Sequence, residues 1–548
     1  MRTSTDLAQL AERELGELAP DLLPGFRAAL PRAVDTVGRR LRGALHRERL
    51  VVARPGPGDR AHAFDRVEFA GAPALSALLG HVSDPGVPGL AAELTDAVVN
   101  LAIAYARPRQ AGGPAPDDRL VWYERLATEG HNLHPCGRTR LGWHTADVLA
   151  HDLETPGTGV GFIGVHHSRH VGDDLGAALR AEHPGVPTAP PGYVVQPVHA
   201  WQLRLLAERY RDLMAAGVLL PLDAPELPVL PTAALRTVLL PAGACGNRQY
   251  LKLSLDIQVT STRRTISVAS TRNGPVISVL LHRLLADDPD GSRIVLLDEV
   301  AGAALDAGAG RNRDAAAILR TGLAGLVEPG EQAVPGVALP ATDPRTGRPV
   351  LAGLVDAYAA TRGYADPAVA AGGFLDEYAG LLLPVVLRLA TRYGVGLEAH
   401  LQNCVPTFRD GVPRRMILRD FAGLRLHLPR LRARAAAPPL WPGSVVATDD
   451  VDVLRAKVAY TALQAHLGEL VVVLAGTHGL DEPGAWRRIR ERVDDVYGPL
   501  RADPAIRAAA AADHAFLTAP RVLHKALVRM RLAGSGDVYV PVANPLHG

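Results

Sequence analysis

Three polar side chains that could do chemistry stand at alternate positions of the segment L-E-A-H-L-Q-N, residues 397–403: Glu398, His400 and Gln402. In an extended strand, every second side chain lies on the same face. The segment is therefore predicted to be a strand that presents a carboxylate, an imidazole and an amide in one row, with its apolar residues on the opposite face.

A second carboxylate is expected to return beside this row. Arg419-Asp420 follows later in the chain, and Asp410-Gly411 lies between the two segments. Asp-Gly is a strong signal for a two-residue β-hairpin turn. Two acids and a histidine brought together in this way predict a metal and anion site, and hence an enzyme.

Another polar row lies in residues 252–264, K-L-S-L-D-I-Q-V-T-S-T-R-R, whose period of two predicts a strand over 251–262. A solvated sheet face has the same pattern, but the varied hydrogen-bonding side chains and the rare lysine favour a lined pocket. Of 59 basic residues only Lys252, Lys457 and Lys525 are lysines. Each is a candidate for a place that needs a compact ammonium group, although Lys457 lies in a plain helical stretch where chance is an equal explanation.

The segment E-G-H-N-L-H-P-C-G-R-T-R-L-G-W, residues 129–143, is rich in histidine and arginine. His131 and His134 with Arg138 and Arg140 could hold phosphate or carboxylate oxygens, the arginines by two-pronged hydrogen bonds. A metal site is a weaker interpretation, because H-x-x-H has no third ligand nearby. Isolated histidines in the core or on the surface are the remaining alternative.

Several common catalytic signatures are absent or unconvincing. Residues 159–164 match G-x-G-x-x-G, but no clear strand precedes them, and the histidine-rich residues 166–170, expected to be an exposed loop, follow. None of the lysines follows a glycine, which excludes the phosphate-loop signature, and neither H-E-x-x-H nor G-x-S-x-G occurs. Nucleotide chemistry here would need a less common phosphate site.

The composition is that of a globular protein. A length of 548 residues predicts about three domains or subdomains, and a net charge of +2 argues against a general nucleic-acid binder. Residues 1–18 lack the pattern of a secretory signal, and the apolar runs at 381–390 and 470–475 are short. We expect a soluble, cytoplasmic protein with no membrane partner. The three scattered cysteines predict neither disulfides nor a zinc cluster.

The elements that position these motifs are read as α+β. The pattern predicts three domains, at 1–120, 121–380 and 381–548. The first holds helices at 7–18, 33–48 and 90–105, before a loop or linker at 107–118. The second mixes strands with helices, including one at 276–286. The third is expected to contain an apolar helix, the hairpin, and helices at 453–475, 484–496 and 505–532.

Six blocks, in order from about residue 120 to the end, carry a family resemblance. The family pattern G-H-P-x-H-P-x-x-K-x-R-x-G is similar to residues 130–142, P-V-H-P-W-Q to 197–202, S-x-R-T to 234–237 and K-L-x-L-x-I-x-x-T-x-x-x-R to 252–264. E-x-H-x-Q-N at 398–403 and R-D at 419–420 match without change, and Lys525, 530–531 and 544–546 resemble the closing elements. The chain thus resembles the siderophore synthetases that work without a non-ribosomal peptide template, the aerobactin-synthetase (IucA/IucC) family.

This resemblance implies a cupped-hand fold of three domains (thumb, fingers and palm), a homodimer, and an ATP- and Mg²⁺-dependent ligase. Such an enzyme adenylates a carboxylate of citrate or a related acid and condenses it with an amine, polyamine or hydroxyl, releasing AMP and pyrophosphate. The sequence leaves open free citrate, a citryl intermediate, a succinyl-type acid or 2-oxoglutarate. It does not name the nucleophile.

The resemblance also implies roles for individual residues. The magnesium ligands would be Glu398, Asn403 and Asp420. The nucleotide would be held by Arg236, Thr237, Lys252, His131, Arg138, Gln402, Asn403 and Asp420. The substrate would be held by Thr260, Arg264, His400 and Lys525, and the catalytic residues would be His400, Arg264 and Lys252.

Three departures from the family pattern affect the phosphate contacts. Ala234 stands where the family has a serine, so that a hydroxyl contact is lost or is supplied by Thr232, while Asn132 replaces a proline and Arg138 a lysine. Two alternatives stay open. One is a kinase-like phosphotransferase built on Glu398 and Asp420. The other is a non-catalytic carboxylate-binding relative.

Overall fold

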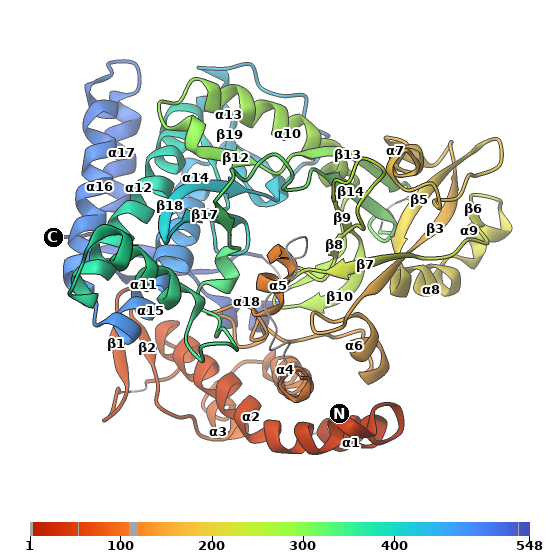
Figure 1. Ribbon diagram of the computed structural model, residues 1–548, viewed down its shortest axis with the longest axis horizontal. Helices are drawn as coiled ribbons and strands as arrows, with labels where there is room; N and C mark the ends of the chain where they lie inside the picture. The colour runs from red at the N-terminus through yellow and green to blue at the C-terminus, as the bar shows by residue number, and fades with distance from the viewer. Residues whose placement is uncertain (1–3, 53, 109–118, 309, 535) are drawn as a thin grey trace.

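The computed structural model describes residues 4–52, 54–108, 119–308, 310–534 and 536–548. Figure 1 shows the N-terminal helices along one edge of the molecule, a large sheet on one side and the C-terminal helices on the other. The predicted α+β class is confirmed. Most of the predicted linker, residues 109–118, lies outside the described residues.

The N-terminal helices form where the apolar spacing predicted them. Apolar positions at helical spacing pack α2 against α4, and both contribute to one buried core with Leu41, Leu94 and Ile103. The elements of this region are α1 (Ser4–Leu18), α2 (Leu23–Arg47), β1 (Arg60–His62), β2 (Arg66–Glu68), α3 (Leu75–Leu79), α4 (Val87–Ala106), α5 (Arg119–Arg125) and α6 (Thr145–His151).

Among the described residues, the largest sheet has nine strands in the order β4-β13-β14-β9-β8-β7-β3-β5, with β6 also paired to β3. All of its pairings are antiparallel. Its strands are β3 (Thr158–His166), β4 (His170–Gly172), β5 (Tyr193–His199), β6 (Leu219–Pro221), β7 (Leu227–Pro231), β8 (Thr237–Leu239), β9 (Tyr250–Leu253), β13 (Glu299–Leu305) and β14 (Ala316–Arg320). The helices beside it in sequence are α7 (Leu175–Glu182), α8 (Ala200–Arg209), α9 (Arg211–Ala215) and α10 (Val268–Ala286).

A second sheet carries the predicted hairpin. Its order is β12-β18-β17-β15, and β17 (Cys404–Arg409) pairs antiparallel with β18 (Val412–Leu418). Asp410 and Gly411 form the two-residue turn with φ of 51° and 79°, the positive values that such a turn needs. The flanking strands are β12 (Ile294–Leu296) and β15 (Gln332–Ala333). The hairpin prediction is confirmed.

The remaining elements surround this hairpin. They are β16 (Val395–Gly396), β19 (Arg425–His427), β20 (Ala447–Thr448), β21 (Arg521–Lys525), β22 (Tyr539–Ala543), α11 (Val350–Arg362), α12 (Pro367–Tyr393), α13 (Leu428–Arg432), α14 (Val451–Val458), the π-helix Ala459–Leu467, α15 (Gly468–His478), α16 (Glu482–Ala502), α17 (Arg507–Leu517) and α18 (Leu527–Ala533). The predicted boundaries at 120 and 380 fall inside α5 and α12. The division into three domains stays a prediction.

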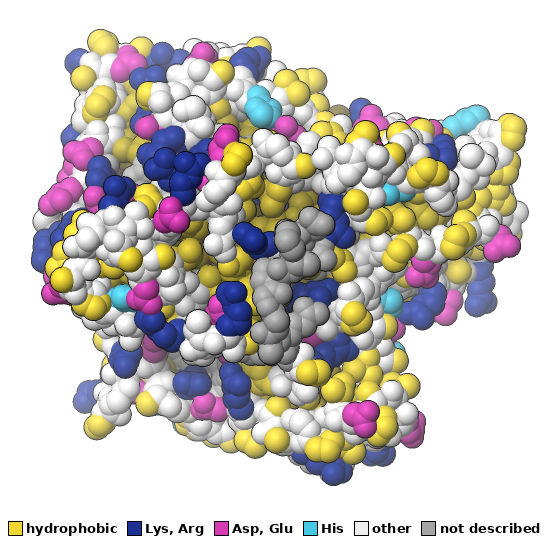
Figure 2. Space-filling model, in the orientation of Figure 1, with side chains coloured by type: hydrophobic (Ala, Val, Ile, Leu, Met, Phe, Trp, Pro, Cys, Tyr) yellow, Lys and Arg dark blue, Asp and Glu magenta, His cyan; other side chains and the backbone are white. Residues whose placement is uncertain are grey.

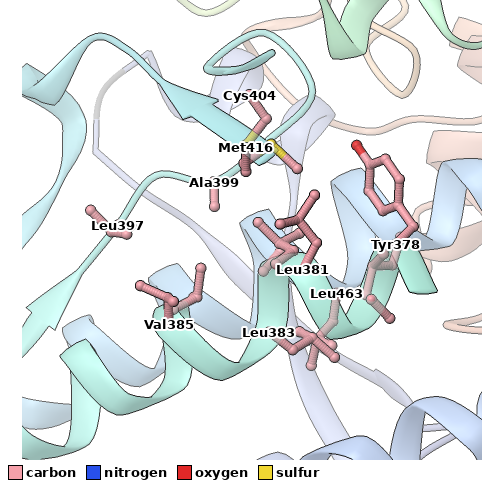
Figure 3. Close-up of a cluster of buried hydrophobic side chains, with 14 of the residues drawn as sticks. Tyr378, Leu381, Leu383, Val385, Leu397, Ala399, Cys404, Met416 and Leu463 are labelled. Atoms are coloured by element: carbon pink, nitrogen blue, oxygen red, sulfur yellow. The ribbon is translucent and has the colours of Figure 1, made fainter. Parts of the chain in front are cut away.

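The strand predicted over 397–403 is wrong. This segment is a loop between β16 and β17, because the backbone N–H groups of His400 and Asn403 donate to Glu398 and His400 and close tight turns. The predicted alternation of burial nevertheless holds, since Leu397, Ala399 and Leu401 are buried. In Figure 3, Leu397 and Ala399 lie above α12, the helix that carries Leu381 and Val385. Apolar anchoring therefore fixes the loop without strand pairing.

Three other predicted elements have different bounds. The strand over 251–262 is divided at Ser254, whose hydroxyl donates to Arg313, into β9 and β10 (Leu255–Val259), and the chain then turns back as β11 (Thr262–Arg264). The helix at 276–286 begins at Val268, capped by Ser267. The helix at 505–532 is broken after Leu517, because Pro520 cannot continue a helix and residues 521–525 form β21.

Three long apolar helical runs have the length and composition of membrane spans: Val87–Ala106, Pro367–Tyr393 and Val451–His478. The short apolar runs expected from the sequence are therefore parts of longer helices. Between 67% and 89% of each span is buried inside the fold. These apolar surfaces serve as the internal core.

Candidate active site

Two carboxylates from the predicted site each hold a buried lysine. Asp420, after the end of β18, accepts a hydrogen bond from Lys252 Nζ of β9 at 2.6 Å. Glu398, in the loop before β17, accepts one from Lys457 Nζ of α14 at 2.8 Å. The third lysine, Lys525, has its Nζ 2.8 Å from a carboxylate oxygen of Asp537. All three rare lysines therefore face carboxylates.

Asp420 is surrounded by cations. Arg320 of β14 lies 3.2 Å from Asp420, and Arg236 is close enough to affect its ionisation. Burial alone would raise the pKa of Asp420, but attraction to Lys252, Arg320 and Arg236 holds that pKa well below its ordinary value. Burial, helped by the two arginines, lowers the pKa of Lys252 to about 8 despite Asp420.

Backbone conformations that side chains rarely adopt occur at three of these motifs. Leu235, Thr260 and Asp420 have φ of 60°, 56° and 65°. A β-branched residue such as threonine with positive φ is strained by its Cβ contacts. Strain of this kind persists where the surrounding structure holds it and is concentrated at functional sites.

A small pocket collects several of the predicted nucleotide-binding residues. Thr237, Gln402, Asn403 and Asp420 line it together with Arg320. Within the described part of the chain, the buried hydroxyl of Thr237 has no hydrogen-bond partner. The pocket therefore offers an uncommitted hydroxyl beside two cations and a carboxylate. Its other lining residues are Thr232, Ala234, Tyr250, Leu297 and Arg419.

The predicted acid-binding residues Thr260 and Arg264 are in contact. Arg264 donates through Nη2 to Thr260 Oγ1 at 3.0 Å, and its buried Nε has no partner among the described residues. Arg236 donates to the backbone carbonyls of Arg264 and Thr265 and so holds this turn in place. Burial, Arg236 and Arg140 lower the pKa of Arg264, as expected for a guanidinium without a carboxylate partner.

His131 lies near this guanidinium and near a second histidine, His400. His131 accepts a hydrogen bond at Nδ1 from the backbone N–H of Leu133 at 3.1 Å, which leaves Nε2 to carry the proton of the neutral ring. Burial and His400 lower the pKa of His131 to about 3. His400 Nε2 is 3.9 Å from Glu398, and burial lowers its pKa against the attraction of that carboxylate. Both rings are neutral at physiological pH and can donate to an anion without adding charge.

Other predicted residues serve the fold in this structure. Arg138 is buried and pairs with Asp152 and Glu154, each at 3.0 Å, and Arg140 pairs with Asp152 as well. These pairs occupy the Arg138 guanidinium, and its phosphate-binding role stays a prediction. His134 is held by the backbone N–H of Cys136 and by a serine hydroxyl at position 261. The Thr232 hydroxyl donates to the carbonyl of residue 237.

The motifs that were set aside, and one of the family blocks, are structural. Residues 159–164 lie inside β3, which pairs with β5, so they form no phosphate-binding turn. Residues 167–169 form the exposed turn expected from the sequence, while residues 166 and 170 end β3 and begin β4. In the P-V-H-A-W-Q block, Gln202 bonds to the backbone of Asp256 and Asp314. This block therefore joins α8 to β10 and to the loop before β14.

Two charged residues of the site were missed. Arg320 bridges Glu299 and Asp420 although it ends an ordinary apolar strand, so the sequence around it gave no signal. Lys457 was noted only for the rarity of lysine, and its position beside Glu398 depends on a contact between distant segments. Lys457 is followed by the π-helix, in which His466 contacts the carbonyl of Ala399 at 3.0 Å. Irregular helical turns of this kind are frequent at functional sites.

The described residues contain no group of three or more His, Cys, Asp or Glu side chains placed to hold a metal ion. Glu398 and Asp420 affect each other's ionisation, so they share one neighbourhood. Mg²⁺ typically uses one or two carboxylates together with substrate phosphates and waters. The donor set therefore fits Mg²⁺ only when phosphate oxygens complete it.

Taken together, the site holds more cations than carboxylates in a largely buried setting. On the face seen in Figure 2, Lys and Arg side chains are gathered around the centre of the view. Concentrated guanidinium and ammonium groups bind and neutralise phosphate and carboxylate oxygens. An α+β fold with this centre defines a protein that binds a polyanion next to two ionised carboxylates.

Comparison with known proteins supports the family resemblance. Residues 119–341 match the model described as the IucA / IucC family, and residues 373–539 match one described as Ferric iron reductase FhuF-like transporter. The predicted resemblance to the IucA / IucC family is confirmed by this match and by relatives named as siderophore synthetases.

Curated relatives cover part of the chain. The uncharacterized protein y4xN of Sinorhizobium fredii (strain NBRC 101917 / NGR234) is 30% identical over 57% of this chain and 50% of its own length. D-ornithine--citrate ligase of Staphylococcus aureus (strain NCTC 8325 / PS 47) is 27% identical over 54% and 48%, and staphyloferrin A synthase of the same organism is 24% identical over 78% and 73%. The chain spans about half the length of the first two relatives.

Solved structures share the fold over nearly the whole chain. Petrobactin biosynthesis protein AsbB from Bacillus anthracis superposes with a TM-score of 0.80 at 20% identity, covering 96% of this chain and 97% of the other. ATP-bound aerobactin synthetase IucA from Klebsiella pneumoniae gives 0.74 at 18% identity, covering 94% and 99%.

Proposed function

We propose that this chain is an ATP- and Mg²⁺-dependent ligase of siderophore biosynthesis. It adenylates a carboxylate of citrate or a related acid and condenses it with an amine or hydroxyl, releasing AMP and pyrophosphate. One observation carries the proposal: Lys252, Arg320 and Arg236 gather around Asp420, with Arg264 and Glu398 close by. Relatives named as a citrate–ornithine ligase and a citryl-spermidine ligase support citrate as the acid and an amine as its partner.

In this proposal the cations hold the triphosphate. Lys252, Arg236 and Arg320 lie together in the buried part of the site, and Thr237 adds a hydroxyl donor. Neutralising the phosphate charge lets a carboxylate oxygen approach the α-phosphorus, and preorganised donors in a buried site are most effective at this task. Gln402 and Asn403 line the same pocket and supply amide contacts.

The acid is held on the other side of the two carboxylates. Arg264 offers its unpartnered Nε, Thr260 lies in contact with it, and His400 and His131 supply neutral donors. A guanidinium bound to one carboxylate of the acid leaves another carboxylate to attack. The amine then displaces AMP from the acyl adenylate.

Glu398 and Asp420, with Asn403 as a further oxygen donor, would hold Mg²⁺. There it would neutralise phosphate charge. In the same proposal the protein is cytoplasmic and forms a homodimer.

A kinase-like phosphotransferase could use the same carboxylates, and product analysis separates the two functions. In the presence of Mg²⁺, we expect the release of pyrophosphate from ATP to depend on the added acid. The release is expected to be lost in Asp420→Ala and Arg264→Ala. Acid-dependent ADP formation without pyrophosphate would refute the ligase proposal, and binding of citrate without turnover would identify a non-catalytic relative.

A further inference from the structure

A second cavity lies across the 130–133 loop from the centre just described. Its volume is about 360 Å³, and α2, β2 and this loop form much of its wall. Gly130, Asn132 and Leu133 line the cavity, whereas His131 lies close to His400 and Arg264. One short loop therefore borders both spaces. A cavity of this size accommodates a small molecule.

Arg47, the last residue of α2, is the unusual side chain of this wall. It is 8% exposed, and its Nε has no hydrogen-bond partner among the described residues. Arg47 forms no ion pair with a carboxylate of the described residues. Its one hydrogen-bond contact there joins Nη1 to His524 Nε2 at 3.4 Å. A buried cation without a counter-charge is costly unless a ligand supplies one.

The chain sets the ring of His524 to accept from Arg47. His524 Nδ1 is 2.8 Å from the Oε1 atom of Gln464, whose Nε2 donates to the carbonyl of residue 523. Because that amide orientation makes Gln464 Oε1 an acceptor, His524 Nδ1 carries the proton and Nε2 is the acceptor. Burial and Arg47 hold the pKa of His524 well below its ordinary value. Arg47 is therefore held in place by a neutral ring.

The other charges of the wall are already balanced. Arg40 pairs with Glu129, and Arg66 pairs with Glu469 and Glu68. Glu48 accepts hydrogen bonds from two backbone N–H groups of α18, and burial raises the pKa of its carboxyl to about 7. Glu48 and Glu469 attract Arg47 at longer range, but no carboxylate of the described residues forms an ion pair with it.

Tyr460 connects this cavity with the catalytic centre. Its ring lies 5.4 Å from that of His524, and its buried hydroxyl has no partner within the described ranges. The ionisation of Tyr460 responds both to Arg47 and to Glu398. Tyr460 is therefore near enough to both spaces for a charge in either one to affect it.

We propose that Arg47 binds the carboxylate of the amine co-substrate, so that this enzyme uses an amino acid with a free amine in preference to a simple polyamine. The inference rests on the proposed function, because it assigns the nucleophile of that reaction. A guanidinium recognises a carboxylate by paired hydrogen bonds. The amine end of the same molecule extends past the 130–133 loop toward the acyl adenylate.

Matched amines test this assignment. The wild-type enzyme is given ATP, Mg²⁺, citrate and either ornithine or its decarboxylated form 1,4-diaminobutane, and either 2,3-diaminopropionate or ethylenediamine. Loss of a charge-assisted hydrogen bond corresponds to about tenfold or more in affinity. We expect kcat/KM to be about tenfold or more higher for each amino acid than for its diamine. Equal or better use of the diamines by the wild type would overturn the inference.

Variants identify the residue. Arg47→Gln is expected to raise the KM for the amino acid and to leave the diamine KM nearly constant, which removes the preference. Arg27→Gln, on the same helix but paired with Glu12 away from the cavity, is the control and keeps the preference. A folded Arg47→Gln enzyme that kept it would contradict the assignment. If this variant does not fold, the wild-type comparison decides.

The failure of this inference is distinguishable from failure of the proposed function. ATP–pyrophosphate exchange by the wild type with citrate and no amine measures adenylation alone. If the wild type catalyses this exchange but uses amino acids no better than the matched diamines, only the assignment of Arg47 is overturned. Absence of exchange with any acid would overturn the proposed function itself.

Discussion

The pKa of Lys252 makes the first half-reaction sensitive to alkaline pH. Burial, with Arg236 and Arg320 nearby, lowers this pKa from 10.5 to about 8 in the free protein, although Asp420 opposes the shift. Only the ammonium form can bind phosphate. The profile of kcat/KM for ATP reports groups of the free enzyme, so it should fall above pH 8 by about tenfold per pH unit.

The assay is ATP–pyrophosphate exchange with citrate in the absence of amine, so that amine ionisation does not contribute. Lys252→Arg is the matched variant, because a guanidinium stays charged throughout this range. We expect a lower but nearly constant kcat/KM for the variant from pH 7.5 to pH 9.5, a range of about two units.

Unfolding does not account for the predicted fall. The folded-state pKa of Lys252 lies below its unfolded value, so burial of the ammonium costs stability below pH 8, and this cost is relieved as the pH rises toward 10.5. A wild-type profile that stays flat to about pH 9.5, or an equal fall in Lys252→Arg, would refute this role for Lys252.

Three further changes test the geometry. Gly423→Ala places a Cβ on the Glu398 carboxylate, so exchange activity should fall at least about tenfold with little change in Tm. The control is Gly380→Ala, which adds a Cβ in open space on α12. A Gly423→Ala enzyme with normal activity would contradict the placement of Glu398. Lys457→Met leaves Glu398 without its 2.8 Å partner and should lower the free energy of unfolding by about 2–3 kcal/mol in urea, a loss that neutralising Glu398 to Gln should largely restore. Gly411→Ala forces an L side chain into φ of 79° against the backbone of α11 and should cost at least about 1–2 kcal/mol in the same measurement; no loss would show that the turn can relax.

Local chemistry made part of the fold predictable. The Asp410-Gly411 turn follows from the positive φ that both residues tolerate, and the N-terminal helices follow from apolar spacing alone. The 397–403 segment shows the limit of this reasoning. Its alternation correctly gave the burial of each residue, but an anchored loop satisfies the same pattern as a strand.

The site was less predictable where it depends on distant contacts. The family motifs identified Lys252, Arg264 and Asp420 as site residues, and the structure brings them into one cluster. Arg320 ends a strand with no distinctive pattern, and only the antiparallel pairing of β14 with β9 places it beside Lys252. Arg47 likewise belongs to an ordinary amphipathic helix. Its lack of a counter-charge is visible only in the folded chain.

The central claim is that the acid is activated by transfer of AMP to its carboxylate. Citrate labelled with ¹⁸O in its carboxylates tests this most directly when it is incubated with ATP, Mg²⁺ and an accepted amine. The attacking carboxylate oxygen stays on phosphorus when the amine displaces AMP, so we predict one ¹⁸O atom in AMP for each amide formed. Label in inorganic phosphate, accompanied by ADP, would contradict the account.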